Sequence, residues 1–373
     1  MSPQQNQQSP TPAYELTSVD ADLVRIRGSL QGILDKMGPF VNGQEGAPAV
    51  LMKFGHQPPV ARLSDEECGD PEQWFFIGDL HGDFFALHTF LKTAMKHRTD
   101  CRIMFLGDIV DRGDFPFETL FLLLEWGLHH PGRLAWIAGN HDVAFSQNSF
   151  GHFVSQVSPA EFLDNLNAND EMQSFRHLLG DFFVALTKKL PRALLFTDGL
   201  LATHGGFPLA DRHAQGLAAE SESAYMSWLG SVECLEDFTW TRIHRAPKKL
   251  PDRHSRGSQY GFRDFEAFCA LQPTFFSVKR MITGHEHPAG GHLIHASYQV
   301  NPAMTLVGLG FDEMKPSMQD RYRHYRGTLS LAQGRRDALP AVIEIPVEIS
   351  DLQLMLPTLE IVPPPVLVER IDD

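Results

Sequence analysis

Residues 74–83, WFFIGDLHGD, begin a pattern that recurs twice, as RIMFLGDIVDRG at 102–113 and as LAWIAGNHD at 134–142. Each stretch is a short apolar run that stops at a glycine followed by Asp or Asn. Between these runs, segments 84–95 and 117–124 place apolar residues three and four positions apart, which predicts amphipathic helices. Strands that alternate with helices predict a parallel α/β core with right-handed crossovers. Ligands bind beyond the carboxyl ends of such strands, so the glycine turns mark a site.

Outside this core the sequence predicts further helices and strands. We expect a helix around 20–37, loop over 38–71, and one longer helical stretch from about 158 to 190. The dipeptide Asp198-Gly199, between the apolar runs 193–196 and 200–203, is typical of a β-hairpin. A further strand is expected at 280–283, and closing strands, mostly antiparallel, at 304–309, 328–331 and 341–345.

Composition and charge exclude several classes of protein. The chain has 373 residues, 43% of them apolar and 21% charged, which is ordinary globular composition. Its formal net charge of −14 argues against a nucleic-acid coat, which needs basic surface to displace counterions. No apolar run is long enough to cross a membrane, and the polar start MSPQQNQQSP lacks the features of a secretory signal. Four scattered cysteines without a CxxC pair fit a reducing cytoplasm, so we expect a cytoplasmic protein.

Five turns, each after an expected strand, carry side chains that bind metals. Their sequences are GDLHGD (78–83), GDIVDRG (107–113), GNHD (139–142), HGG (204–206) and GHEH (284–287). Any one of them alone is more often a turn or a hydrogen-bonded histidine than a ligand, but their joint occurrence at strand ends favours a metal site. Carboxylate, imidazole and amide ligands suit two divalent ions such as Mn, Fe or Zn. A two-metal centre generates a hydroxide nucleophile at neutral pH.

This set of motifs resembles the phosphoprotein phosphatase (PPP) family of the calcineurin-like metallophosphoesterase superfamily over about residues 72–346. The resemblance implies that Asp79, His81 and Asp108 hold a first metal, and that Asp108 bridges to a second. The second metal would be completed by Asn140, His204 and His285. It also implies an α/β fold, a four-layer α-β-β-α sandwich of two mixed sheets with the dimetal site at the strand ends.

The resemblance also assigns residues to the substrate. Arg112 is similar to the arginine that clamps the phosphate, His141 to the general acid, and Asp111 to the carboxylate that orients His141. For a second clamping arginine we expect Arg256, in an Arg-Gly pair, with Arg242 or Arg253 as alternatives. His287 is either a further ligand of the first metal or a solvated histidine.

The sequence departs from the eukaryotic members of the family near the end of the matched region. Val307-Gly308-Leu309-Gly310-Phe311 stands where they carry Ser-Ala-Pro-Asn-Tyr, and the last ligand turn is GHEH. We therefore interpret the chain as a bacterial-type or divergent member. The expected organisation is an N-terminal extension (1–71) with an unstructured start and one helical stretch, a catalytic domain (72–348) and a proline-rich C-terminal arm (349–373).

The sequence leads to three hypotheses about function. The first is a metal-dependent phosphomonoesterase that hydrolyses phosphoprotein esters of Ser and Thr, and of Tyr as well, by direct attack of a dimetal-bound hydroxide. Its partner would be a phosphorylated protein or peptide, without nucleic acid or membrane. The second is a nucleotide or dinucleoside polyphosphate hydrolase with the same metal core. The third is a non-catalytic phosphate-binding scaffold that keeps its metals for stability.

Overall fold

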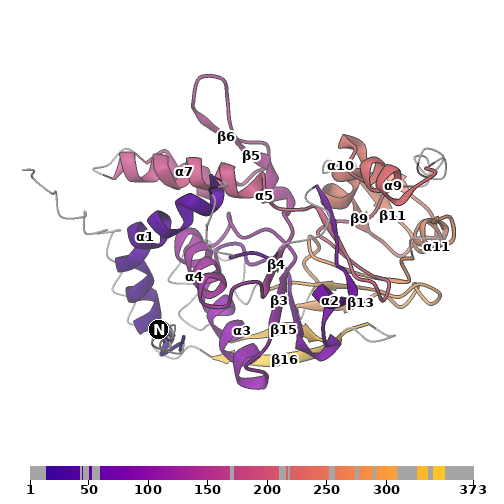
Figure 1. Cartoon of the computed structure of the whole chain (residues 1–373), viewed down its shortest axis with the longest axis horizontal. Helices are drawn as coiled ribbons and strands as arrows, with labels where there is room; N and C mark the ends of the chain where they lie inside the picture. Colours follow the sequence, from indigo (N-terminus) through magenta and orange to yellow (C-terminus); the bar gives the residue numbers. More distant parts are fainter. Residues whose placement is uncertain are drawn as a thin grey trace, which may run out of the picture.

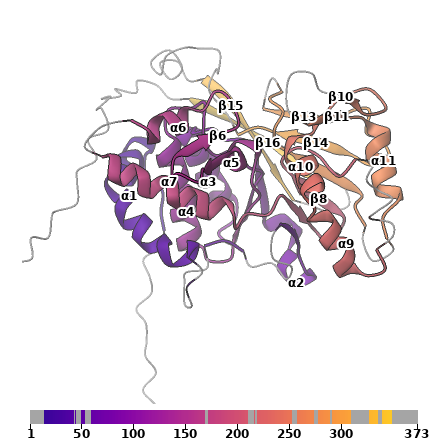
Figure 2. The same cartoon turned by 90° about the horizontal axis from the view of Figure 1, so that it is seen from above.

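Two main sheets with helices on their outer faces form the core of the described part of the chain (Figures 1 and 2). The computed structural model describes residues 14–42, 44, 50–52, 59–168, 172–209, 216, 219–251, 257–273, 277–288, 291–308, 326–334 and 339–348. The five-stranded sheet has the order β16-β15-β2-β3-β4 (Ala341–Glu348, Arg326–Gln333, Trp74–Ile77, Arg102–Phe105, Leu134–Trp136). The six-stranded sheet has the order β1-β7-β8-β12-β14-β13 (Val60–Arg62, Ala193–Leu195, Leu200–Thr203, Arg280–Thr283, Ala303–Leu306, His292–Ile294).

Side-chain alternation along the strands divides the core into three layers of packing. In β2, Phe75 and Ile77 pack with the helices α1 (Val19–Val41), α3 (Phe84–His97), α4 (Pro116–His129) and α7 (Gln173–Thr187). Trp74 and Phe76 of the same strand face the second sheet. The outer face of that sheet packs against α9 (Glu222–Leu229), α10 (Val232–Trp240) and α11 (Phe262–Ala270). This α-β-β-α order, visible in Figure 2, confirms the predicted fold class.

Strand direction brings the motif turns together. β2, β3 and β4 are parallel to one another, as are β8, β12 and β14. An isolated parallel bridge pairs Asp79 with Val307, which follows β14, so the carboxyl ends of the two parallel sets lie next to each other. Short elements complete this part of the chain: α5 (Asn140–Ala144), the hairpin β5 (Phe145–Gln147) and β6 (Phe153–Ser155), and α6 (Glu161–Leu166).

Two expectations from the sequence are wrong. The region 38–71 is not loop alone, because β1 pairs there with β7 and a short helix, α2 (Asp65–Cys68), follows. The stretch 158–190 forms two helices, since α6 ends at an Asn167 C-cap before α7 begins. The prediction of mostly antiparallel closing strands is confirmed: β15 pairs antiparallel with β16 and β2, and β14 is antiparallel to β13, although it is parallel to β12. The expected hairpin of β7 and β8 is confirmed.

The N-terminal helix is attached to the core by buried ion pairs. Asp22 is almost fully buried and lies 3.0 Å from His88 Nε2 of α3, and its carboxylate also accepts the backbone N–H of Thr17. Arg25 and Arg27 form ion pairs with Glu125 and Glu118 of α4. No helix among the described residues is long and apolar enough to cross a membrane. The proline-rich arm expected at 349–373 lies outside the described residues.

Candidate active site

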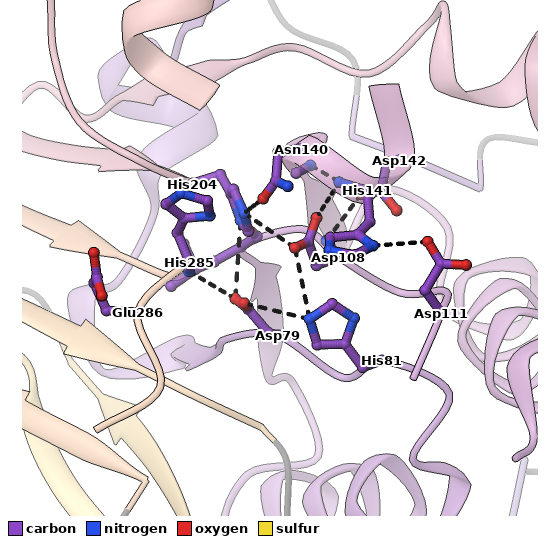
Figure 3. A network of polar contacts seen from close by, with 12 residues as sticks. Asp79, His81, Asp108, Asp111, Asn140, His141, Asp142, His204, His285 and Glu286 are labelled. Carbon is purple, nitrogen blue, oxygen red and sulfur yellow. Dashed lines mark hydrogen bonds and ion pairs between the residues drawn. The ribbon is translucent and has the colours of Figure 1, made fainter. Parts of the chain in front are cut away.

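Five strand ends deliver the predicted ligand side chains to one buried cluster (Figure 3). The residues that follow β2, β3, β4, β8 and β12 are, in this order, Asp79, Asp108, Asn140, His204 and His285. Three side chains at its centre are fully buried: the carboxylate of Asp79 and the imidazoles of His81 and His204. Of the ten site residues predicted from the sequence, only Arg256 lies outside the described residues, and the other nine lie together.

One group of possible ligands consists of Asp79, His81 and His287, whose donor atoms all lie within 4.8 Å of one another. His287 Nε2 is 3.0 Å and His81 Nε2 is 3.8 Å from Asp79 Oδ2. The sequence left His287 open between a ligand and a solvated histidine. The structure places its imidazole, which is partly exposed, against the carboxylate of Asp79.

A second group consists of Asp108, His204 and His285. His204 Nε2 lies 3.3 Å from Asp108 Oδ2 and 2.9 Å from Asn140 Oδ1, so Asn140 belongs to the same cluster. Asp108 also lies 3.7 Å from His81 Nε2 of the first group. The carboxylate of Asp108 therefore stands between the two groups, where a bridging ligand is required.

Hydrogen bonds from Nδ1 orient two of the histidine rings in the way that is usual for metal ligands. Nδ1 of His81 lies 2.8 Å from the carbonyl of Val110, and Nδ1 of His204 lies 2.8 Å from the carbonyl of Leu106. Donation from Nδ1 to a carbonyl orients each ring so that its Nε2 faces the carboxylates, where it could bind a cation. Nε2 of His81 and Nε2 of His285 are buried and have no hydrogen-bond partner. Burial also holds the pKa values of these two imidazoles well below the usual range. Two orphaned neutral nitrogens beside carboxylates fit a pair of divalent cations.

Strained backbone places these side chains. Among the described residues, positive φ angles outside glycine occur at His81, Asp108, Asp111, Arg112 and His285, all of them in this site. Left-handed backbone at such residues costs about 1–3 kcal/mol each and persists only where surrounding contacts enforce it. Neighbouring glycines make room for the turns, because a Cβ at Gly139 would strike Asp108 and a Cβ at Gly284 would strike Asp79.

Asp142 is a functional residue whose role the sequence did not predict, although GNHD contains it. Its carboxylate accepts the backbone N–H groups of Gly139, Asp108 and Ile109 at 2.9, 2.9 and 3.1 Å. Burial, followed by the nearby charge of Asp108, raises the pKa of Asp142 to about 7. Asp142 therefore ties the turn after β3 to the turn after β4 and fixes the position of Asp108.

Next to the metal-ligand groups lie a histidine and an arginine suited to a phosphate ester. His141 Nδ1 is 2.7 Å from Asp111 Oδ2, which orients the ring and leaves Nε2 directed toward Arg112, 3.4 Å away. Arg112 Nη1 lies 3.0 Å from Nδ1 of His287. The guanidinium thus lies between the ring of His141 and the first ligand group, where it can contact an anion bound there.

Glu161 is a second residue that the sequence analysis did not predict, and it holds the backbone of Arg112 in place. Glu161, the first residue of α6, accepts the backbone N–H of Arg112 at 2.9 Å. The next residue, Phe162, donates its N–H to Asp111 Oδ1 at 3.0 Å. The start of α6 therefore holds the strained Asp111-Arg112 turn, and no motif in the sequence marks it.

Of the three candidates for a second phosphate-binding arginine, Arg242 belongs to the described residues. Arg256 and Arg253 lie outside the described residues, so the Arg256 assignment stays a prediction. Arg242, at the start of β9 (Arg242–Ile243), lies beside the second ligand group. Its Nη1 is 3.4 Å from the carbonyl of His285 and 3.3 Å from Glu286 Oε1.

Comparison with protein families gives the same result as the geometry. The model of the calcineurin-like phosphoesterase family matches residues 75–289, more than half of the chain. The chain belongs to this family. The recognition of this family from the sequence motifs is thereby confirmed.

Relatives of this calcineurin-like phosphoesterase are similar at low identity. Serine/threonine-protein phosphatase T of Schizosaccharomyces pombe is 24% identical over 224 residues, which cover 60% of this chain and 43% of that protein. The serine/threonine-protein phosphatase 6 catalytic subunit of Caenorhabditis elegans is 29% identical over 131 residues, 35% of this chain and 34% of that protein. A solved protein serine/threonine phosphatase from Saccharomyces cerevisiae, described as similar to human phosphatase PP5, has a TM-score of 0.49 at 15% identity, covering 90% of this chain and 92% of that one. The chain spans less than half the length of these curated relatives.

Proposed function

We propose that the chain is a phosphomonoesterase that removes phosphate from phosphoserine and phosphothreonine in proteins, with the help of two divalent metal ions. The observation that carries this proposal is the pair of ligand groups with Asp108 between them, together with the orphaned Nε2 atoms on His81 and His285. A phosphate ester requires both cationic binding and a proton donor, and Arg112 and His141 lie beside these groups.

The donor atoms assign the ligands of each metal. Asp79, His81, His287 and Asp108 would hold the first ion, and Asp108, Asn140, His204 and His285 the second. This mixed carboxylate, imidazole and amide set suits Mn, Fe or Zn. Two metal ions held there would neutralise the charge of the phosphate oxygens and would lower the pKa of bound water.

The protein's own side chains bind the phosphate and move the proton. The planar guanidinium of Arg112 meets two phosphate oxygens, both in the bound substrate and in the transition state. His141, protonated and held by Asp111 at 2.7 Å, donates its Nε2 proton to the departing ester oxygen. The carboxylate of Asp111 stabilises the imidazolium before transfer and keeps the ring in one orientation.

Arg242 is our proposed second phosphate-binding arginine among the described residues. It approaches the site from the side of the second ligand group, opposite the position of Arg112 beside the first. The carboxylate of Glu286 lies 3.3 Å from its guanidinium and so restricts its orientation. Arginines on both sides would cover the oxygens that the metals leave exposed.

The names of the relatives support a phosphoprotein substrate over a nucleotide, since those reported above are serine/threonine phosphatases. The test compares kcat/KM for phosphoserine, phosphothreonine and phosphotyrosine peptides and for diadenosine tetraphosphate, all with added Mn. We expect turnover of phosphopeptides to exceed that of the dinucleotide. Faster hydrolysis of diadenosine tetraphosphate would overturn the substrate assignment in favour of a polyphosphate hydrolase. Absence of all turnover in metal-replete protein would support the non-catalytic scaffold.

A further inference from the structure

A cavity of about 390 Å³ lies outside the metal centre, between a basic segment and an edge strand. Its lining comprises Arg245, Leu293, Ile294, His295, Ala296 and Ser297. One wall is the chain that follows β9, and the other is β13 and the turn after it. β13 is the last strand of the six-stranded sheet. Figure 2 shows it on the same side of the molecule as β10 (Leu250–Pro251), β11 (Ser258–Tyr260) and α11. None of these lining residues has a role in the site described above.

Both walls start at the active site. Arg245 comes three residues after Arg242, which contacts the carbonyl of His285. β13 begins at His292, five residues after His287 of the first ligand group. The hydroxyl of Tyr298, in the turn after β13, donates to the carbonyl of His244 at 3.4 Å and so joins the two walls. A chain lying in the cavity would therefore continue toward the bound phosphate.

The basic wall contrasts with the rest of the protein. Segment 242–251, RIHRAPKKLP, has four Lys or Arg and no Asp or Glu, although the whole chain carries a net charge of −14. Arg245 and Lys248 are exposed, and neither makes a hydrogen bond or ion pair with another described residue. An exposed cation that no described residue pairs, on a segment that leads to the candidate active site, attracts anionic groups on a substrate.

The opposite wall exposes two large apolar side chains. Leu293 is 40% and Ile294 is 54% exposed, although both are large apolar residues on an edge strand. Exposed apolar residues that line a hollow next to a charged rim are typical of a site for another protein chain. The cavity therefore offers apolar contact on one side and positive charge on the other.

We propose that this cavity binds the segment of a phosphoprotein substrate next to its phosphorylated residue, and that it selects segments with an acidic side chain paired to Arg245. The proposal rests on the phosphoprotein phosphatase function proposed above. The three-residue separation of Arg242 and Arg245 spans at most about 10 Å of extended chain. A substrate in extended conformation covers the same distance in three residues, so the acidic residue lies within three positions of the phosphorylated one.

The test uses phosphoserine peptides that differ at one position. Glu or Lys is placed three residues before, or three residues after, the phosphoserine, and kcat/KM is measured for each peptide and for p-nitrophenyl phosphate. The wild-type protein is compared with Arg245→Glu and with the milder Arg245→Gln. Lys36→Glu serves as the matched control, because it reverses an exposed charge on α1, on the opposite side of the molecule (Figure 1).

We expect the wild type to prefer Glu over Lys by about fivefold at one of the two positions, the range of an exposed charge pair. Arg245→Glu should invert this preference, Arg245→Gln should abolish it, and Lys36→Glu should keep it, all with unchanged activity on p-nitrophenyl phosphate. Equal preference in wild type and Arg245→Glu would overturn the cavity proposal while leaving the proposed function intact. Hydrolysis of p-nitrophenyl phosphate without hydrolysis of any peptide would overturn the phosphoprotein function itself.

Discussion

Removal of the Glu161 side chain should weaken phosphate binding without loss of metal. Glu161 contacts neither ligand group; its carboxylate accepts the backbone N–H of Arg112 at 2.9 Å. Arg112 has a φ of 64°, and the preceding Asp111 has a φ of 68°. Without its acceptor, this strained turn can relax toward ordinary backbone, which displaces the guanidinium that we expect to clamp the phosphate.

The expected magnitude follows from the contacts at the turn. A hydrogen bond to a charged group contributes about 1.5–3 kcal/mol, and each 1.4 kcal/mol corresponds to a factor of ten. The bond from Phe162 N–H to Asp111, at 3.0 Å, still holds the other half of the turn. We therefore expect the low end of this range for Glu161→Ala, about a tenfold loss of kcat/KM. Glu161→Gln, which keeps an acceptor oxygen, should lose clearly less.

The assay has to separate positioning of Arg112 from stability of α6. Asp164→Asn is the matched control, because Asp164 is an exposed acid in the first turn of the same helix. For each variant we would measure kcat, KM, inhibition by inorganic phosphate and metal content. Glu161→Ala should raise KM and weaken phosphate inhibition at full metal content. If it behaves like Asp164→Asn in all four measurements, Glu161 does not position Arg112 and the reasoning is refuted.

Three further changes test other parts of the molecule. Asp108→Asn should lose most bound metal, since it removes the bridging charge, and full metal content by elemental analysis would contradict the bridge. His141→Asn should lower kcat on phosphoserine peptides by about 10²–10⁴-fold but less on p-nitrophenyl phosphate, whose phenolate leaves without a proton; equal losses would exclude His141 as the acid. Asp22→Ala should lower the free energy of unfolding by about 1–3 kcal/mol in urea, because His88 loses its buried partner, whereas the exposed Asp20→Ala should not.

Residues with a local signal were predictable from the sequence. Asp79, Asp108 and Asn140 each follow a short apolar run and a glycine, so the strand, the turn and the ligand lie within ten residues of one another. The parallel strand order then brings their side chains to one edge, a general property of parallel α/β sheets. His204 and His285 were predictable in the same way, because β8 and β12 are short strands that end at glycine-bearing turns.

Residues that act through distant contacts were not predictable. Glu161 lies 49 positions from Arg112, on a helix of six residues, and nothing near it in the sequence differs from an ordinary helix start. β1 is a strand of only three residues, and its partner β7 lies far along the chain. The contact of Arg242 with the His285 carbonyl likewise joins the start of β9 to the turn after β12, 43 positions along the chain, which a single sequence does not encode locally.

Backbone strain explains why the ligands were easier to predict than the residues that support them. Local propensity disfavours positive φ at His81 and Asp108, yet the site requires it at both. Other residues must supply the opposing free energy: Asp142 accepts the N–H of Asp108, and the carbonyl of Asp108 accepts the N–H of His81 at 2.9 Å. These supporting groups act by holding the backbone in place and not by binding metal, so no ligand motif marks them. Substitution of Asp142 should therefore impair the site as severely as loss of a ligand, although Asp142 belongs to none of the ligand groups.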